Sequence, residues 1–319
     1  VAAEVRAAEQ RSRPYLLTTP AVPSIGLTAA IGSEVVLKCE NLQHTGSFKA
    51  RGAVSKVLSL TPDELERGVI TASTGNHGVA VAYAGSIVGV APTVVVPDNA
   101  NPSTLAAIER LGGRIEVHGT DSVESELGAR RAAGERGLTF VSPYNDPAII
   151  GGQGTLGVEL LEQVDHLSAV FVAVGGGGLS SGVAGIVKSV SPATRVIGCS
   201  PANSAVMYHS LRAGEILDMP SDPTLSDGTA GGVEPGAITL GLLDELLDDF
   251  VTVPEDAIRE AFLELIEVEH RLVEGSAAIA KDAAAQQLAD RLTASSVLDF
   301  PLFIYTLFGG LVVRRAMER

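Results

Sequence analysis

The sequence is poor in cysteine, in basic residues and in long apolar runs. Its 319 residues include two cysteines, Cys39 and Cys199, which are too few for a disulfide framework and suit a reducing compartment. Lysine and arginine together number 23 against 38 aspartates and glutamates, and the resulting net charge of −15 argues against nucleic acid or an anionic membrane surface as a partner. The most apolar stretch, residues 300–313, contains a proline and two glycines and falls short of the roughly 20 residues that a membrane span needs.

The first residues are already charged and contain no apolar core of a signal peptide, so we expect a cytoplasmic protein. Hydrophobic residues make up 45% of the chain and charged residues 19%, which is typical of a globular protein with a large core. A chain of this length favours two domains.

Strand-like and helix-like segments alternate along the chain, and this alternation predicts α/β architecture with mostly parallel sheets covered by helices on both faces. We expect strands at 34–39, 69–71, 93–96, 114–117, 139–141, 169–174 and 195–199. Among the helices, we expect one to begin after the glycine-rich residues 151–154, one to have Pro254 at its first position and one to begin at Gly275.

A lysine stands at the start of one predicted helix. Residues 40–53 read Glu-Asn-Leu-Gln-His-Thr-Gly-Ser-Phe-Lys-Ala-Arg-Gly-Ala. Thr45 or Ser47 is suited to be the N-cap, because a short hydroxyl accepts from an unpaired amide of the first turn. Lys49 then lies in the first turn, where the positive end of the helix dipole makes its amine easier to deprotonate. A lysine that traps a carbonyl compound needs this unprotonated form.

Four glycines, Gly175 to Gly178, lie between a predicted buried strand and a predicted helix. Backbone amides without side chains at a helix N-terminus favour an anion site over a plain turn. The dinucleotide pattern Gly-x-Gly-x-x-Gly fails here, because serine occupies its last position. The nucleophile-elbow pattern does match at residues 178–182 around Ser180, with His270 downstream, so a hydrolase stays open as an alternative. It leaves the Lys49 segment unexplained.

Three further segments are candidates for a binding site. Residues 73–77, Ser-Thr-Gly-Asn-His, supply several hydrogen-bonding groups at a helix start, which is more than capping needs. Residues 226–232, Ser-Asp-Gly-Thr-Ala-Gly-Gly, form a Gly/Asp-rich loop. Glu274 directly precedes the helix that begins at Gly275.

The Lys49 segment resembles the Schiff-base segment of the fold-type II pyridoxal-phosphate enzymes, in the branch of the threonine/serine dehydratases and serine racemase. The matching residues are Glu40, Asn41, Gln43, Thr45, Gly46, Ser47, Phe48, Lys49, Arg51, Gly52 and Ala53. The resemblance implies a fold like that of tryptophan synthase β and a Schiff base between Lys49 and pyridoxal 5'-phosphate, with Phe48 beside the cofactor ring. It also implies a phosphate site made by Gly175, Gly176, Gly177, Gly178 and Leu179.

The same resemblance implies roles for the other segments. Ser73, Thr74, Gly75, Asn76 and His77 are expected to bind the substrate carboxylate, and Asn76 also to contact the 3-hydroxyl of the cofactor. Thr74 stands where serine racemase has a catalytic serine, which makes it a second catalytic candidate. Glu274 is expected near the ring, and the loop at 226–232 beside a structural cation whose ligands stay unassigned. Arg51, His44 and Glu40 are expected to be scaffolding.

The resemblance further implies a homodimer and a discontinuous arrangement of domains. Residues 68–142 would form a small domain inserted into a large cofactor-binding domain made of residues 1–67 and 143–319.

One motif departs from the family pattern. The last strand of these enzymes ends Ser/Thr-Gly-Gly-Asn and its hydroxyl contacts the pyridine nitrogen, whereas this chain has Phe308-Gly309-Gly310-Leu311. Phenylalanine offers no hydrogen bond, so we expect Thr306, two residues earlier on the same face of the strand, or a water to replace it.

The function that the resemblance implies is elimination of water from threonine or serine, in amino-acid catabolism, to give a 2-oxo acid and ammonia. Three alternatives stay open: a dehydratase of another 3-hydroxy amino acid, such as the hydroxyectoine-utilisation type, a serine or threonine racemase, and a catalytically impaired pyridoxal-phosphate-binding protein.

Overall fold

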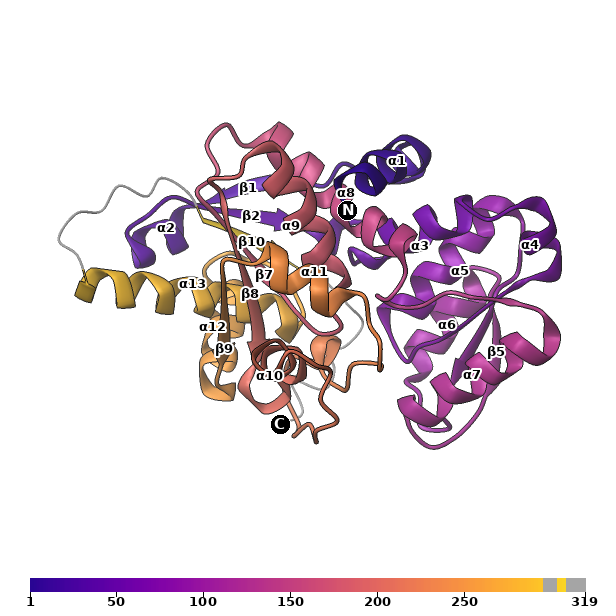
Figure 1. Ribbon diagram of the computed structural model, residues 1–319. Helices are drawn as coiled ribbons and strands as arrows, with labels where there is room; N and C mark the ends of the chain where they lie inside the picture. The colour runs from indigo at the N-terminus through magenta and orange to yellow at the C-terminus, as the bar shows by residue number, and fades with distance from the viewer. Residues whose placement is uncertain (295–302, 308–319) are drawn as a thin grey trace.

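The computed structural model describes residues 1–294 and 303–307, with side chains described through residue 284 apart from residue 31. The strands in this part of the chain form two sheets, one with the order β1-β2-β10-β7-β8-β9 and one with the order β5-β4-β3-β6 (Figure 1). All neighbouring strands are parallel except β1 and β2, which are antiparallel. The predicted α/β architecture with mostly parallel sheets is confirmed.

The larger sheet consists of β1 (Ala21–Ser24), β2 (Val35–Cys39), β7 (Ala169–Ala173), β8 (Arg195–Pro201), β9 (Asp249–Val253) and β10 (Phe303–Leu307). The smaller sheet consists of β3 (Val69–Ala72), β4 (Thr93–Val96), β5 (Arg114–Val117) and β6 (Thr139–Phe140).

The helices of the first half are α1 (Ala2–Ser12), α2 (Ile25–Ile31), α3 (Lys49–Leu58), α4 (Pro62–Arg67), α5 (Asn76–Val88), α6 (Pro102–Arg110), α7 (Ser122–Arg136) and α8 (Pro147–Gln163). Those of the second half are α9 (Gly178–Val190), α10 (Val206–Ala213), α11 (Thr239–Leu246), α12 (Glu255–Glu267) and α13 (Gly275–Ala294). Short 3₁₀ helices are η1 (Arg13–Tyr15), η2 (Glu40–Leu42), η3 (Ala202–Ser204) and η4 (Asp227–Thr229). Within the described ranges, no helix combines the length and the apolar character that crossing a membrane requires.

The centre of the larger sheet is covered on both faces. Strands β2 and β7 are buried along their whole length, as expected of parallel strands that helices cover on either side. Helix α9 packs on β7 and β8, and α13 packs on the same two strands and on β9. Their apolar side chains form the largest described core cluster, which includes the fully buried Phe171.

The smaller sheet shows the two-residue period of a strand directly. Val94 and Val96 of β4 pack with α5 and α6, whereas Val95 packs with Ile70 and with Ala129 of α7. Alternate residues therefore serve opposite faces, and both faces are covered by helices.

Residues 69–140 supply all four strands of the smaller sheet, and the strands of the larger sheet come from both sides of this segment. Helix α3, which follows β2 of the larger sheet, packs through Ala53, Val54 and Val57 on α5, which follows β3 of the smaller sheet. The domain limits at 67/68 and 142/143 stay a prediction.

Two predicted helix starts were wrong. Helix α8 begins at Pro147 with Asp146 as its N-cap and runs through the glycines that we expected to precede it. These glycines are helical because α8 lies against backbone there: a Cβ at Gly152 would be 2.5 Å from the Arg51 oxygen, and one at Gly154 would be 2.7 Å from the Gly182 oxygen. Helix α12 begins one residue later than predicted, with Pro254 as its N-cap rather than its first residue.

Candidate active site

Lys49 is the first residue of α3, as the sequence predicted, but neither predicted hydroxyl caps this helix. The N-cap is Phe48, whose backbone is already helical, with φ −58° and ψ −18°. The hydroxyls of Thr45 and Ser47 are buried and have no hydrogen-bond partner within the described residues. The cap prediction was wrong, because neither hydroxyl accepts a hydrogen bond from an amide of the first turn.

The amine of Lys49 is buried. Its Nζ donates a hydrogen bond of 3.0 Å to the carbonyl oxygen of Pro143 and lies 5.3 Å from the centre of the Phe48 ring. Burial lowers the pKa of Lys49 to about 8, and the carboxylate of Glu274 opposes part of this shift. The direction agrees with the sequence prediction, but the main cause is loss of solvent rather than the helix dipole.

The four glycines form the turn between β7 and α9. Gly177 has φ +86°, a conformation that favours glycine, and α9 begins at Gly178. A Cβ at Gly176 would overlap the ring of Tyr144, and one at Gly178 would lie 2.9 Å from the Tyr144 Cα. The turn therefore packs closely on Tyr144 and presents backbone amides at the start of a 13-residue helix.

A cavity of about 180 Å³ lies between the Lys49 segment and this glycine turn. Its lining residues are Phe48, Lys49, Pro143, Tyr144, Ala173, Gly175, Gly176, Gly177, Gly178, Leu179, Gly228, Thr229, Ala230, Gly231, Gly232, Glu274 and Ser276. The structure thus brings together Phe48, Lys49, the predicted phosphate residues and Glu274. Residues 73–77 are not among those that line it.

The segment at 73–77 nevertheless reaches the cavity through one hydrogen bond. It precedes and begins α5, with Gly75 as N-cap and Asn76 as the first helical residue. Asn76 Nδ2 donates to Glu274 Oε2 over 3.1 Å, which links the smaller sheet to the cavity wall. Thr74 is exposed, and the hydroxyl of Ser73 accepts from the Gly75 amide.

His77 is buried at the start of α5. Its Nε2 lies 3.2 Å from the carbonyl oxygen of Val141. Burial lowers the pKa of His77 to about 3, and the positive charge of Lys49 contributes to the shift. The ring is therefore neutral at physiological pH and donates from Nε2 to this carbonyl.

Glu274 has an unusual acidity. Burial raises the pKa of its carboxyl group to about 7, and the negative charge of Asp227 adds to this shift. The hydrogen bond from Asn76 and the positive charge of Lys49 oppose it. An acid that is half protonated near neutral pH, close to a lysine of lowered pKa, is typical of a site that moves protons.

The loop at 226–232, one of the candidate binding segments, contributes residues 228–232 to a wall of the cavity. Ser226 Oγ lies 2.5 Å from Thr229 Oγ1 and 3.1 Å from Ser276 Oγ, so these hydroxyls tie the loop to the start of α13. Its glycine content was the available signal. Within the described residues no cluster of three His, Cys, Asp or Glu side chains could hold a metal ion, and the structural cation stays a prediction.

Pro143 and Tyr144 also line the cavity without having been predicted. Tyr144 covers the glycine turn, and its hydroxyl accepts a hydrogen bond of 2.7 Å from the amide of Glu234. Burial raises the pKa of the Tyr144 hydroxyl to about 12. No local sequence pattern marks these residues, because only the tertiary fold brings them beside the turn.

The hydrolase interpretation was wrong. Ser180 is fully buried within α9, and its hydroxyl donates to the carbonyl oxygen of Gly177 over 3.2 Å. A nucleophile needs an accessible oxygen next to a base.

The expected contact to the ring nitrogen lies at the limit of the described residues. Thr306 belongs to β10, where its backbone pairs opposite Lys38 of β2. Its side chain and the segment from Phe308 to Leu311 lie outside what the structure describes, so this hypothesis stays a prediction.

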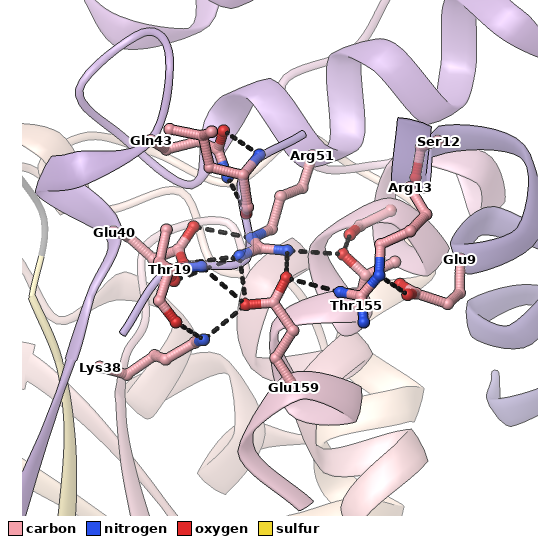
Figure 2. A network of polar contacts seen from close by, with 12 residues as sticks. Glu9, Ser12, Arg13, Thr19, Lys38, Glu40, Gln43, Arg51, Thr155 and Glu159 are labelled. Carbon is pink, nitrogen blue, oxygen red and sulfur yellow. Dashed lines mark hydrogen bonds and ion pairs between the residues drawn. The ribbon is translucent and has the colours of Figure 1, made fainter. Parts of the chain in front are cut away.

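Behind the Lys49 segment lies a buried network of ion pairs (Figure 2). Arg51 forms two hydrogen bonds to Glu40, of 2.7 and 2.8 Å, and two to Glu159, of 2.8 and 2.9 Å. Lys38 Nζ lies 2.5 Å from Glu159 Oε2. These charges are paired with one another rather than directed into the cavity, so Arg51 and Glu40 are scaffolding that fixes α3 against β2 and α8.

The residues present fit pyridoxal phosphate. The side-chain-free turn at the start of α9 suits a phosphate, and the lysine on the opposite wall has the lowered pKa that imine formation with an aldehyde requires. The model for the family "Pyridoxal-phosphate dependent enzyme" matches residues 13–298. The chain belongs to this family.

Named relatives fall in the expected branch. An L-threonine ammonia-lyase of Thermotoga maritima is 38% identical over 285 residues, which are 89% of this chain and 71% of the relative. The solved structure of maize serine racemase superposes with a TM-score of 0.91 at 32% identity, covering 99% of this chain and 95% of the other. The crystal structure of a T.th. threonine deaminase gives a TM-score of 0.87 at 36% identity, with 97% of each chain covered.

Proposed function

We propose that this protein is a pyridoxal-phosphate-dependent ammonia-lyase that eliminates water from threonine or serine and releases a 2-oxo acid and ammonia. One observation carries the proposal: the buried amine of Lys49 and the glycine turn of α9 line the same cavity. Relatives named L-threonine ammonia-lyase support the choice of reaction.

The chain's own residues divide the work of binding. The amides of Gly175 to Gly178 would hold the cofactor phosphate, and Phe48 would lie against the ring, with Glu274 near it. When bound, the cofactor supplies an aldehyde for the substrate amine and a ring that stabilises negative charge at Cα.

Lys49 Nζ moves the proton in this proposal. With the substrate bound, it would take the Cα proton, for which it must be neutral. A pKa near 8 makes a substantial fraction neutral at physiological pH, whereas an ordinary lysine at about 10.4 is almost fully charged. The β-hydroxyl would then take up a proton and leave as water, and the released enamine would add water to give the 2-oxo acid and ammonia.

Residues 73–77 would bind the substrate carboxylate at the N-terminus of α5, whose amides and dipole favour an anion. Asn76 would contact the 3-hydroxyl of the cofactor from this position. Thr74 is the proposed residue on the face opposite Lys49, where its hydroxyl would act if the enzyme also racemises its substrate.

The remaining expectations belong to the same proposal. Residues 1–67 and 143–319 would form the large domain and residues 68–142 the small one. A homodimer, a cytoplasmic location and a structural cation are expected from the resemblance and from composition.

The test is product analysis with the cofactor-loaded protein. Incubation with threonine and with serine should release 2-oxo acid and ammonia in equal amounts. Lys49→Ala should abolish this release and the visible absorbance of the bound cofactor, because the amine is lost. Lys56→Ala, on the same helix but paired with Asp146, is the matched control and should keep both. D-amino acid without 2-oxo acid would contradict the lyase proposal in favour of a racemase.

A further inference from the structure

One wall of the cavity consists of very small residues. The segment at 228–232, between α10 and α11, reads Gly-Thr-Ala-Gly-Gly, and all five residues line the cavity. The other walls carry Phe48, Tyr144 and the charged side chains of Lys49 and Glu274. This wall therefore places fewer side-chain atoms against the cavity than the other walls do.

Packing or backbone conformation requires glycine at two of the three glycine positions in this wall, but not at the third. At Gly228 a Cβ would lie 2.8 Å from Ser276 Oγ and 3.2 Å from Glu274 Oε1, so packing excludes a side chain. Gly231 has φ +112°, which excludes one by backbone conformation. Gly232 has neither restriction: its φ is not positive, and a Cβ there would have no heavy atom within 4 Å. Neither packing nor backbone conformation explains glycine at position 232.

The wall is held at both ends. Ser226 and Thr229 are joined at one end by their hydroxyls. At the other end the amide of Glu234 donates to the Tyr144 hydroxyl, and its carboxylate pairs with Arg130 of α7 over 2.5 Å. These contacts fix the segment, in which Gly232 is exposed and lines the cavity.

The charges of the cavity limit what this space accepts. Its charged lining residues are Lys49 and Glu274. Since Lys49 has its proposed role at Cα, the described lining residues offer no further cation to pair with a second carboxylate, and burying an unpaired charge is unfavourable.

We propose that Gly232, together with Ala230, leaves room for an uncharged β-substituent larger than the methyl group of threonine. This inference rests on the proposed function and makes its substrate class 3-hydroxy-2-amino acids with side chains of ethyl size or more. Gly232 is a specificity-determining residue of the site.

The test compares threonine with 2-amino-3-hydroxypentanoate, which has one more methylene. The wild-type enzyme should turn over both with kcat/KM values within about threefold of one another. Gly232→Val should lower kcat/KM for the longer substrate at least tenfold and for threonine less than threefold, because one methylene in a filled pocket is worth about 10–200-fold. The matched control is Gly241→Val on α11, where a Cβ also meets nothing within 4 Å and which is not part of the cavity wall; it should change neither value.

Calorimetry supplies a readout that does not need turnover. Norvaline and 2-aminobutyrate match the two substrates but have no hydroxyl to eliminate, and Gly232→Val should weaken the binding of norvaline alone. If the wild-type enzyme disfavours the longer substrate by about a hundredfold, or if Gly232→Val affects both ligands equally, the inference is overturned. A third outcome separates the two proposals. If Gly232→Val selectively weakens norvaline binding but the wild-type enzyme releases no 2-oxo acid from either substrate, the proposed function is refuted and the role of Gly232 in ligand size selection is still supported.

Discussion

Two turns of this molecule each join a parallel strand to a helix, but they differ in their side chains and in how closely they pack. Each follows the carboxyl end of a parallel strand and begins a 13-residue helix: the turn at 175–177 joins β7 to α9, and the turn at 73–75 joins β3 to α5. The first consists of glycine and packs closely on Tyr144. The second has hydroxyl side chains, and a Cβ at its Gly75 would meet nothing within 4 Å.

We propose that the difference reflects how long each of the two anions would stay bound. A cofactor phosphate remains in place, and a tightly packed set of backbone amides holds it without any side chain to order. A substrate carboxylate enters and leaves at every turnover, so open space and polar side chains suit it better. Variants of the glycines in the two turns test this contrast.

Gly176→Ala should have the largest effect. The new methyl group overlaps the Tyr144 ring, which the Glu234 amide holds in place, so we expect a loss of about 1–3 kcal/mol in the free energy of unfolding and at least tenfold weaker cofactor binding. Thermal unfolding and a fluorescence titration with pyridoxal phosphate measure the two effects. Tyr144→Ala in the same chain should restore part of the cofactor affinity. Unchanged affinity in the single variant would show that the packing is loose.

Glu274→Gln should have an intermediate effect, which is a change in how the free energy of unfolding depends on pH. The pKa of Glu274 is raised to about 7 in the folded protein, so between its ordinary value and 7 the folded protein binds a proton that the unfolded chain does not. The carboxyl group therefore contributes stability that is complete at low pH and is lost as the pH rises through about 7.

Urea unfolding of the cofactor-free protein at pH 5 and pH 8 measures this contribution. We expect Glu274→Gln to reduce the difference between the two free energies of unfolding by about 2 kcal/mol. Glu260→Gln, at an exposed position on α12, is the control. An identical pH dependence in wild type and Glu274→Gln would rule out a raised pKa at this position.

Gly75→Ala should have the smallest effect on the fold. Its methyl group enters open space, so we expect less than about 1 kcal/mol of change in stability and unchanged cofactor affinity. Only KM for threonine should rise, by a few fold, because the methyl lies where the carboxylate would bind. A loss of stability as large as that of Gly176→Ala would remove the contrast between the turns.

The sequence pattern was sufficient to predict those features that neighbouring residues in the chain determine. The strands at 93–96 and 114–117 were predicted with their true bounds from the alternation of strand-like and helix-like segments. Lys49, Phe48 and the glycine turn were identified by short motifs, and the structure places all of them around one cavity.

The features that the sequence did not predict depend on tertiary contacts between distant segments. The glycines of α8 look like a helix breaker in sequence, but they are helical because neighbouring helices approach too closely for side chains. Tyr144, the wall at 228–232 and the hydrogen bond between Asn76 and Glu274 each join segments far apart in the chain. The low pKa of Lys49 was predicted in direction only, because its cause is burial.

The glycines of α8 that lie against α3 and α9 have a consequence for how such an enzyme can acquire new substrates. Helix α8 touches the backbone of α3 at Gly152 and the backbone of α9 at Gly154, so close main-chain contacts help to set the spacing between the lysine and the glycine turn. That spacing does not depend on the identity of any side chain that meets a substrate. New specificities can therefore arise by substitutions in the loops while the distance on which the chemistry depends is inherited unchanged.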